Sequence, residues 1–366
     1  MKIKVLYNDS QSLKECLEGK KRIMTYGAGV WADTIKKMLK ENGYSLDYAI
    51  VDDAYYANCG NVVQQGGGTG LISMEKLVPP CNSKEDALIW AIGSPDRLRI
   101  CMEDDESPEE CFLIWEMGFW EDRNYFYVHR EEFQKAGELL CDEYSKKVFR
   151  GYLKAIEGDL EEDLLYSTNG TYFNELTRKR REGAFLDCGS YDGQSALDYM
   201  KFIGEECRVY AFEPDKENFQ NLTRRMQERP DVICLNKGCY SSEKMLSFCS
   251  AGDMSSCLQE DGTECVEVTT IDRAVGDEKV AFIKMDVEGA ELEALKGAEG
   301  VIARDMPVLA ISAYHRQEDL ITLLPYISSL HSQKEHYQLY LRHHGVVQAE
   351  LVLYAIPVER KSLEEM

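Results

Sequence analysis

The sequence predicts an α/β protein built from two Rossmann-like domains. Two stretches carry this prediction, at residues 22–41 and 184–203. Each is a short apolar run, then a glycine turn, then a run with apolar residues at helical spacing. This order is typical of an open, largely parallel sheet that binds a ligand at the carboxyl ends of its strands. The 366 residues are enough for two domains of ordinary size.

The composition favours a cytoplasmic protein that binds small molecules. Lys and Arg number 42 against 65 Asp and Glu, a net charge of −23, which disfavours nucleic acid or an anionic membrane surface as partner. None of the 13 cysteines forms a Cys-x-x-Cys pair, so we expect reduced thiols and no zinc framework. No apolar run reaches the length of a membrane span, and the first residues lack the apolar region of a signal peptide.

Residues 1–130 are expected to form the first domain, which opens with a leader and a short helix. A strand at 22–26, a turn, a helix ending at Asn42-Gly43 and a strand at 46–51 then form a βαβ unit. Its turn contains Gly-x-Gly-x-x-Ala, and an acid follows the second strand, placed to bind a ribose hydroxyl. The candidate nucleotide or nucleotide-sugar site comprises Gly27, Gly29 and Asp52. Because this pattern is short and common, a Rossmann-like domain without a ligand is an equal alternative.

The rest of the first domain is predicted to contain one more buried strand, at residues 87–92. The glycine-rich stretch 64–70 is predicted to be a surface loop, since no Gly-Lys-Ser/Thr follows it as a phosphate-binding loop requires. Residues 103–110 are expected to form an acidic loop. Residues 131–183 are interpreted as a helical connector, interrupted by a polar turn at 166–172, that packs against the second domain.

Residues 184–366 are expected to form the second domain, which opens on a candidate cofactor site. An apolar strand leads to Asp187 and Gly189, and Gly193 begins the next helix. The two glycines would allow a ligand to approach the backbone, and the acid suits a ligand with an amino group and a cation, such as S-adenosylmethionine (SAM). Glu213 ends the next strand, 20 residues after Gly193, where a carboxylate can bind ribose hydroxyls. The alternative is a tight turn and a structural acid.

Residues 280–298 form the most specific stretch of the chain. A buried strand ends at Met285 and is followed by Asp286, Glu288 and a glycine turn into a helix. Charged residues at alternate positions of a strand end are costly unless they are solvated or used. The next strand, at 307–312, places His315 at the same edge, and residues 337–342 and 351–356 are predicted to be a closing pair of strands.

The motifs Phe-Leu-Asp-Cys-Gly-Ser-Tyr-Asp-Gly, Phe-Glu-Pro, Val-Thr-Thr-Ile-Asp and Ile-Lys-Met-Asp-Val-Glu-Gly-Ala-Glu closely resemble the FkbM family of SAM-dependent methyltransferases. The resemblance runs from about residue 172 to 357. It implies a seven-stranded sheet with an antiparallel last strand, SAM as cofactor, and O-methylation of a hydroxyl on a sugar, glycan or related metabolite. Its implied cofactor-binding residues are Asp187, Gly189, Ser190, Tyr191, Asp192, Gly193, Glu213 and Asp286.

The chemistry of methyl transfer needs no metal, but it requires an aligned acceptor and one group that takes a proton. Asp286 is the first candidate for general base or acceptor positioning. His315, which titrates near neutrality if its pKa is unperturbed, is the second. Both could join Glu288 around a divalent cation, but these three side chains are too few to predict a metal site.

Two other functions remain open at this stage. One is a non-catalytic nucleotide-binding module that recruits a partner. The other is a nicotinamide-dependent oxidoreductase that uses the first domain, although His129 is the only histidine there. The acceptor substrate and the oligomeric state do not follow from the sequence.

Overall fold

The computed structural model divides the chain into two compact units. The first contains Met1–Arg123, Arg150–Thr168 and Gly345–Ala349, and the second contains Asn124–Phe149, Asn169–His344 and Glu350–Met366. The residues that the structure describes are 2–6, 10–28, 30–51, 70–73, 84–92, 110–114, 124–157, 167, 170–178, 182–204, 207–249, 257–258, 264–332, 335–345 and 349–359. The expected domain boundaries after residues 130 and 183 stay a prediction about which parts fold independently.

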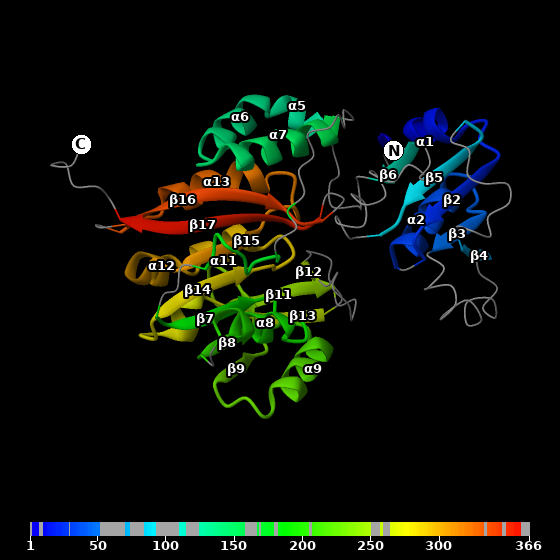
Figure 1. The fold of residues 1–366 in the computed structure, drawn as a ribbon. Coiled ribbons are helices and arrows are strands. Elements are labelled where there is room, and N and C mark those ends of the chain that lie inside the picture. Colours follow the sequence, from blue (N-terminus) through cyan, green and yellow to red (C-terminus); the bar gives the residue numbers. More distant parts are fainter. Residues whose placement is uncertain are drawn as a thin grey trace. The chain divides into compact units, whose positions relative to one another are not determined.

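The first unit contains a six-stranded sheet in the order β1-β6-β5-β2-β3-β4 (Figure 1), and all of its strand pairs are parallel. Its elements are β1 (Lys2–Leu6), α1 (Ser10–Leu17), β2 (Arg22–Tyr26), α2 (Val30–Glu41), β3 (Tyr48–Val51), β4 (Gly70–Ser73), β5 (Asp86–Trp90) and β6 (Glu110–Ile114). The strand order reverses between β2 and β5, where open parallel sheets bind ligands.

Three strands of this sheet were not predicted. The expected glycine-rich loop ends at Gly70, where β4 begins. The expected leader contains β1, and β6 begins at Glu110, the last residue of the expected acidic loop. These two strands pair with each other along their whole length, from Lys2 opposite Glu110 to Leu6 opposite Ile114. Each has only five residues, which is too short for a clear local pattern. They become strands because they pair with each other, although they lie far apart in the sequence.

The second unit is built on a seven-stranded sheet in the order β16-β17-β15-β14-β7-β8-β9 (Figure 1). The strands are β7 (Ala184–Cys188), β8 (Val209–Phe212), β9 (Val232–Leu235), β14 (Val280–Met285), β15 (Val308–Ser312), β16 (Glu335–His343) and β17 (Leu351–Glu359). The last strand, β17, runs antiparallel to both neighbours, and the other adjacent pairs are parallel. The predicted α/β class and the seven-stranded sheet with an antiparallel last strand are confirmed.

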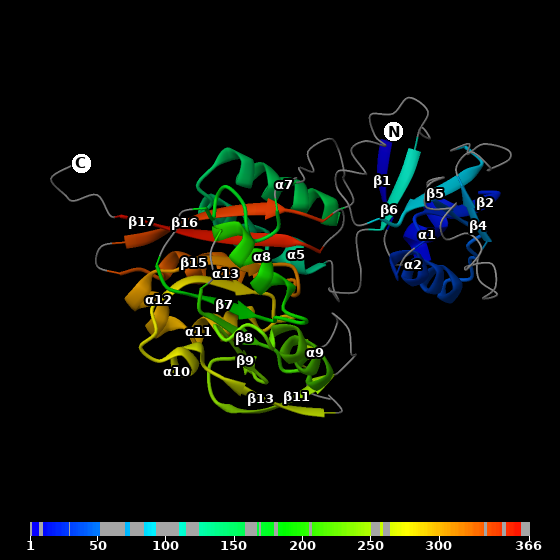
Figure 2. The same ribbon diagram turned by 60° about the horizontal axis from the view of Figure 1, so that its bottom comes forward.

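Helices and a small second sheet surround this framework (Figure 2). The helices are α5 (Asn124–Val128), α6 (Arg130–Glu138), α7 (Glu143–Glu157), α8 (Gln194–Ile203), α9 (Lys216–Met226), α10 (Ile271–Val275), α11 (Glu291–Lys296), α12 (Glu299–Asp305) and α13 (Asp319–Ser329). The small sheet has the order β10-β13-β11-β12, formed by Gly238–Cys239, Glu264–Thr269, Lys244–Cys249 and Cys257–Leu258. Helix α6 packs against α13, and Asp142 pairs with Arg342 of β16 at 2.8 Å.

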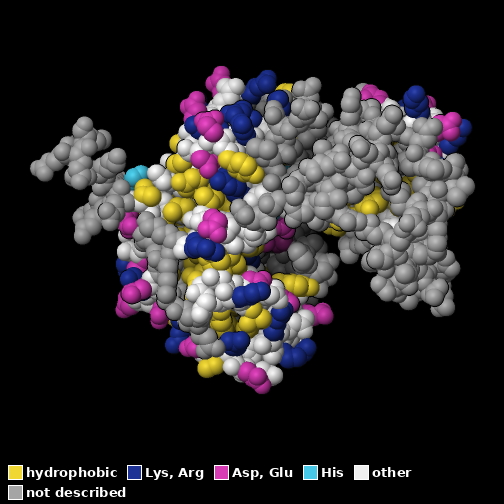
Figure 3. Space-filling view, in the orientation of Figure 1, with side chains coloured by type: hydrophobic (Ala, Val, Ile, Leu, Met, Phe, Trp, Pro, Cys, Tyr) yellow, Lys and Arg dark blue, Asp and Glu magenta, His cyan; other side chains and the backbone are white. Residues whose placement is uncertain are grey.

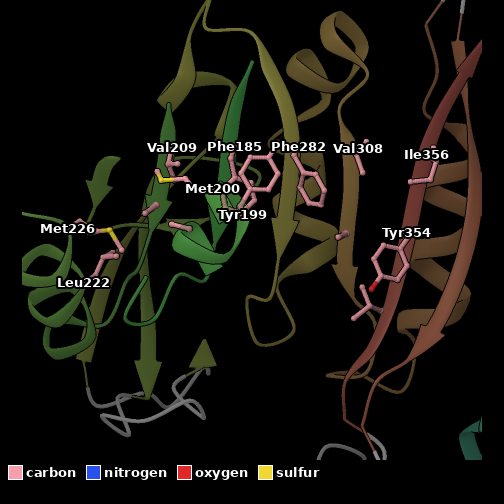
Figure 4. Close-up of a cluster of buried hydrophobic side chains, with 14 residues drawn as sticks. Phe185, Tyr199, Met200, Val209, Leu222, Met226, Phe282, Val308, Tyr354 and Ile356 are labelled. Atoms are coloured by element: carbon pink, nitrogen blue, oxygen red, sulfur yellow. The ribbon is translucent and has the colours of Figure 1, made fainter. Parts of the chain in front are cut away.

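A row of aromatic side chains fills the core beside β7 and β14 (Figure 4). Phe185 stacks on Tyr199 with ring centroids 4.3 Å apart, and Phe282 lies beside both. Phe173, from the segment before β7, packs against all three rings. Close packing of this kind makes the central strands rigid, so their carboxyl ends can hold side chains in fixed positions.

The surface of the second unit carries charged side chains of both signs (Figure 3). On the face of the second unit seen in Figure 3, acidic and basic side chains are interspersed, without a broad patch of one sign. In the described parts of the chain, no helix is both long and apolar enough to cross a membrane.

Candidate active site

The turn between β7 and α8 is shaped by contacts within the protein. Gly189 has φ 79°, and a Cβ there would come within 1.8 Å of the Asp286 carbonyl oxygen, so only glycine allows the two loops to meet. The N–H groups of Gly189 and Ser190 both donate to the Phe212 carbonyl, at 3.1 and 2.9 Å. At Gly193 a Cβ would strike the side chains of α9, including Met226. The two glycines thus bring the turn close to its own neighbours, and their expected role at a ligand stays a prediction.

The carboxylate of Asp187 is fully buried. Oδ2 accepts a hydrogen bond from Ser195 Oγ at 2.6 Å, and Oδ1 lies 3.4 Å from Lys284 Nζ. Lys284 donates in turn to the Gly189 carbonyl at 2.6 Å. Asp187 therefore holds the turn in place through a buried ion pair, and its expected contact with a cofactor stays a prediction.

Glu213 lies at the carboxyl end of β8 and joins that strand to the turn. Its two oxygens accept hydrogen bonds from the N–H groups of Tyr191, at 2.8 Å, and Asp215, at 2.9 Å. Burial raises the pKa of Glu213 to about 7, although both N–H donors act in the opposite direction. Tyr191 is 40% exposed at φ 52°, and Asp192 pairs with Arg225 on α9. The acid predicted to bind a ribose therefore sits beside the turn, as its spacing requires.

Asp286 follows β14 and is held by a residue that the sequence analysis did not single out. Tyr172 donates its hydroxyl to Asp286 Oδ2 at 2.9 Å and lies 3.1 Å from Ser312 Oγ. Burial favours the neutral carboxyl, but Lys284, His315 and the Tyr172 hydrogen bond outweigh it and lower the pKa of Asp286. Asp286 is therefore an anion at neutral pH. Its Oδ1 is buried and accepts no hydrogen bond from the described residues.

Tyr172 is positioned by contacts that only the tertiary structure creates. The segment around it was interpreted as a polar turn, with no signal for a site residue. Its backbone N–H donates to the Tyr354 hydroxyl of β17 at 3.2 Å, and Phe173 fixes the same segment in the aromatic core. Asn174 Nδ2 donates to the same hydroxyl at 3.0 Å. These contacts place the phenol over the end of β14.

His315 follows β15 and lies among three carboxylates. Nδ1 is 2.8 Å from Glu291 Oε1, while Nε2 is 3.4 Å from Asp286 Oδ1 and 3.5 Å from Glu288 Oε2. Burial lowers the pKa of His315, but the carboxylates, led by Glu291, raise it to about 10. The condition under which His315 would titrate near neutrality, an unperturbed pKa, is therefore not met. At pH 7 the ring is an imidazolium, which donates hydrogen bonds and cannot accept a proton.

Among Asp286, Glu288 and His315, Glu288 is the residue whose pKa lies near neutral pH. Burial raises its pKa to about 7, opposed by the charge of His315. Its φ of 52° is unusual for a residue with a side chain, and this backbone turns the chain from β14 towards α11. The same turn brings Glu291, which the sequence analysis did not select, under His315.

The ligand atoms of Asp286, Glu288 and His315 lie within 4.8 Å of one another, so in the described chain these residues form a group that could hold a metal ion. A metal would have to displace the proton that the carboxylates hold on His315. An internal ion-pair cluster accounts for the same geometry.

In the first unit, Gly27 has φ 119°, and a Cβ there would lie 2.5 Å from the Ala91 carbonyl oxygen. This glycine is required by the close approach of the chain after β5. Gly29, Asp52 and the glycine-rich residues 64–69 lie outside the described residues. The nucleotide site of the first unit therefore stays a prediction.

Residues 187–345 match the model of the methyltransferase FkbM domain. The chain contains an FkbM methyltransferase domain. This match includes the turn after β7, Glu213, Asp286 and His315, and it leaves the six-stranded sheet of the first unit outside. The suspected resemblance is thereby confirmed.

The chain is similar to a named methyltransferase and to a solved structure, among other proteins. The hexuronic acid methyltransferase AglP of Haloferax volcanii is 33% identical over 134 residues, which cover 33% of this chain and 52% of that protein. The match thus spans about half the length of that relative. The crystal structure of methyltransferase FkbM from Methylobacillus flagellatus aligns with a TM-score of 0.62 at 23% identity, over 95% of this chain and 93% of that one. At this identity the second comparison shows the fold alone.

Proposed function

We propose that this protein is a SAM-dependent methyltransferase that methylates a hydroxyl oxygen on a sugar, a glycan or a related metabolite. One observation carries the proposal: the FkbM domain gathers Glu213, Asp286 and the Glu288–His315 pair at the carboxyl ends of neighbouring parallel strands. Open α/β sheets bind their ligands at that edge. The sugar class of the acceptor is supported by the name of the relative from Haloferax volcanii.

The chain has groups that fit SAM. Glu213 would bind the ribose hydroxyls with its carboxylate, and Tyr191 and Asp192 would border the site on the turn. Asp286 Oδ1 is a buried carboxylate oxygen that accepts no hydrogen bond from the described residues, although His315 Nε2 lies 3.4 Å away, so it can still accept one from a ligand. When bound, SAM supplies a methyl group on an electrophilic sulfonium.

The lowered pKa of Asp286 suits a positioning role better than that of general base. As an anion it can accept a hydrogen bond from the acceptor hydroxyl and orient that oxygen, which is the larger part of such catalysis. Glu288, with a pKa of about 7, is better matched to take the hydroxyl proton at neutral pH. His315 stays protonated and stabilises both carboxylates as anions.

Calorimetric titration of the full-length protein with SAM tests this proposal, with NAD(H) as the competing ligand. Glu213→Gln keeps the shape but removes a charge, and charge-assisted hydrogen bonds are worth about 1.5–3 kcal/mol each, so SAM affinity should fall about tenfold or more. Glu217→Gln, an exposed acid in the first turn of α9, is the matched control and should bind like the parent. Unchanged binding by Glu213→Gln would place the site elsewhere, and binding of NAD(H) alone would favour the oxidoreductase alternative.

Turnover separates positioning from binding once an acceptor has been found. Asp286→Asn should leave SAM affinity within a few-fold and lower the rate about 10²-fold or more, because the acceptor loses its orienting anion. The assay follows transfer of a labelled methyl group to a panel of sugars and nucleotide-sugars. An Asp286→Asn protein with parental turnover would exclude this residue from the reaction.

A further inference from the structure

A cavity of about 630 Å³ lies next to the Asp286–Glu288–His315 cluster. Gly289 and Arg316, which directly follow two residues of that cluster, both line it. The walls come from the start of α11, the start of α13, strand β11 and Tyr240 in the loop before that strand. The lining residues are Tyr240, Met245, Leu246, Ser247, Gly289, Ala290, Leu292, Glu293, Arg316, Glu318, Asp319 and Thr322. This volume is in the range of about 300–1,000 Å³ that small-molecule sites occupy.

Arg316 is the one basic side chain among these lining residues, and its charge is only weakly compensated. Glu318 Oε1 is 3.8 Å from its Nη1, in an arginine side chain that is 54% exposed. Glu293 is engaged elsewhere, because it pairs with Lys296 at 2.6 Å. Burial raises the pKa of Asp319 to about 8, so this carboxyl is largely neutral at pH 7. The guanidinium therefore keeps donors available for an anion.

The backbone beneath Arg316 has the shape that its side chain needs. Gly289 has φ 91°, and a Cβ there would lie 2.8 Å from Arg316 Nε and 3.3 Å from its Cγ. The arginine thus lies across the loop that carries Glu288, where a larger residue than glycine would push it away. Through this contact the position of the guanidinium is tied to that of the candidate proton acceptor.

We propose that this cavity is the acceptor subsite and that Arg316 binds an anionic group, a carboxylate or a phosphate, on a sugar acceptor. The assignment rests on the proposed methyltransferase function and narrows its substrate class. A planar guanidinium pairs with either anion through two parallel hydrogen bonds, which fixes orientation as well as position. The apolar wall of Tyr240, Leu246 and Leu292 suits the C–H face of a sugar ring, and the hydroxyl to be methylated would lie towards Glu288.

Ligand-observed NMR on the full-length protein saturated with S-adenosylhomocysteine tests the subsite. The probes are D-glucuronate, glucose 6-phosphate and glucose, each at about 10 mM, which detects millimolar affinities. At least one charged probe should bind more tightly than glucose. Arg316→Gln should weaken that probe about tenfold or more, leave glucose unchanged and leave SAM affinity unchanged. Arg224→Gln, an exposed arginine on α9, is the matched control and should behave like the parent.

The two charged probes distinguish the sources of the anion. Preference for glucuronate assigns a carboxylate, and preference for glucose 6-phosphate assigns a phosphate. Arg316→Lys, which keeps the charge but not the planar fork, should recover only part of the affinity. The subsite is overturned if neither charged probe binds better than glucose, or if Arg316→Gln binds both like the parent while SAM still binds. A parent protein that fails to bind SAM would instead overturn the proposed function, and this assignment with it.

Discussion

Lys284→Met is the substitution whose effect the structure defines most sharply. The ammonium group is buried between Asp187 Oδ1, at 3.4 Å, and the Gly189 carbonyl, at 2.6 Å, and its charge also lowers the pKa of Asp286. Methionine keeps most of the apolar stem and removes the charge. The variant therefore leaves Asp187 without its cation, whereas Asp286 keeps His315 beside it, and little packing is lost.

The expected loss of stability is about 3–4 kcal/mol at pH 7. At 3.4 Å and an effective dielectric constant near 20, Coulomb attraction between Lys284 and Asp187 is about 5 kcal/mol. Breaking a buried pair costs about 3–5 kcal/mol, because one charge is left uncompensated. A buried aspartate that has lost its cation can instead take up a proton, and protonating an ordinary aspartate costs about 4 kcal/mol at pH 7. This cost is the upper limit of the destabilisation from one carboxylate, and at pH 5 it is only about 1.5 kcal/mol. The destabilisation should therefore shrink as the pH falls from 7 to 5.

Urea unfolding of the full-length protein can report the two units separately. All four tryptophans, at positions 31, 90, 115 and 120, precede residue 124, so their fluorescence follows the first unit. Far-UV circular dichroism follows both units. Lys284→Met should move the dichroism transition to lower urea and leave the tryptophan transition in place.

Lys201→Met, at an exposed position on α8, should change stability by less than about 0.5 kcal/mol. Adding Asp187→Asn to Lys284→Met should recover part of the loss, because the two residues are directly coupled. A Lys284→Met protein within about 0.5 kcal/mol of the parent at pH 7 would refute the buried ion pair as a structural element.

Three further outcomes are expected. Since only ionised Glu213 accepts two ribose hydroxyls and its pKa is about 7, calorimetry should show SAM affinity falling as the pH drops below 7, and Glu213→Gln should show no such fall. If Glu288 takes the proton, the methyl-transfer rate should rise with pH through about 7. If His315→Gln removes this rise, His315 would be the group that titrates near pH 7, which would contradict its pKa of about 10. Residues 124–366 should melt at a higher temperature than residues 160–366, because the longer fragment retains the helices that pack on α13 and β16, and equal midpoints would argue against that packing.

The sequence by itself determined the α/β class and the edge at which the site lies. Apolar runs that end in Asp187, Glu213 and Asp286 identify parallel strands and their carboxyl ends, and such ends meet at one edge of a sheet. The closing strands and the glycine turn after Glu288 were predictable for the same reason. These are local patterns, set by neighbours within a few residues. The short strands β1 and β6 were not predictable, because each depends on the other across more than 100 residues.

Only the tertiary structure decided what each charged group does. Asp187 is buried against Lys284, Tyr172 reaches Asp286 from another segment, and Glu291 holds the proton on His315. A pattern along the chain shows where a strand ends, but it does not show which side chains from distant segments surround that end. Those neighbours set burial and local charge, and hence the pKa values. The sequence therefore located the candidate site. Packing between distant segments determined the burial and the charged neighbours of each acid, and the roles proposed for these acids rest on both.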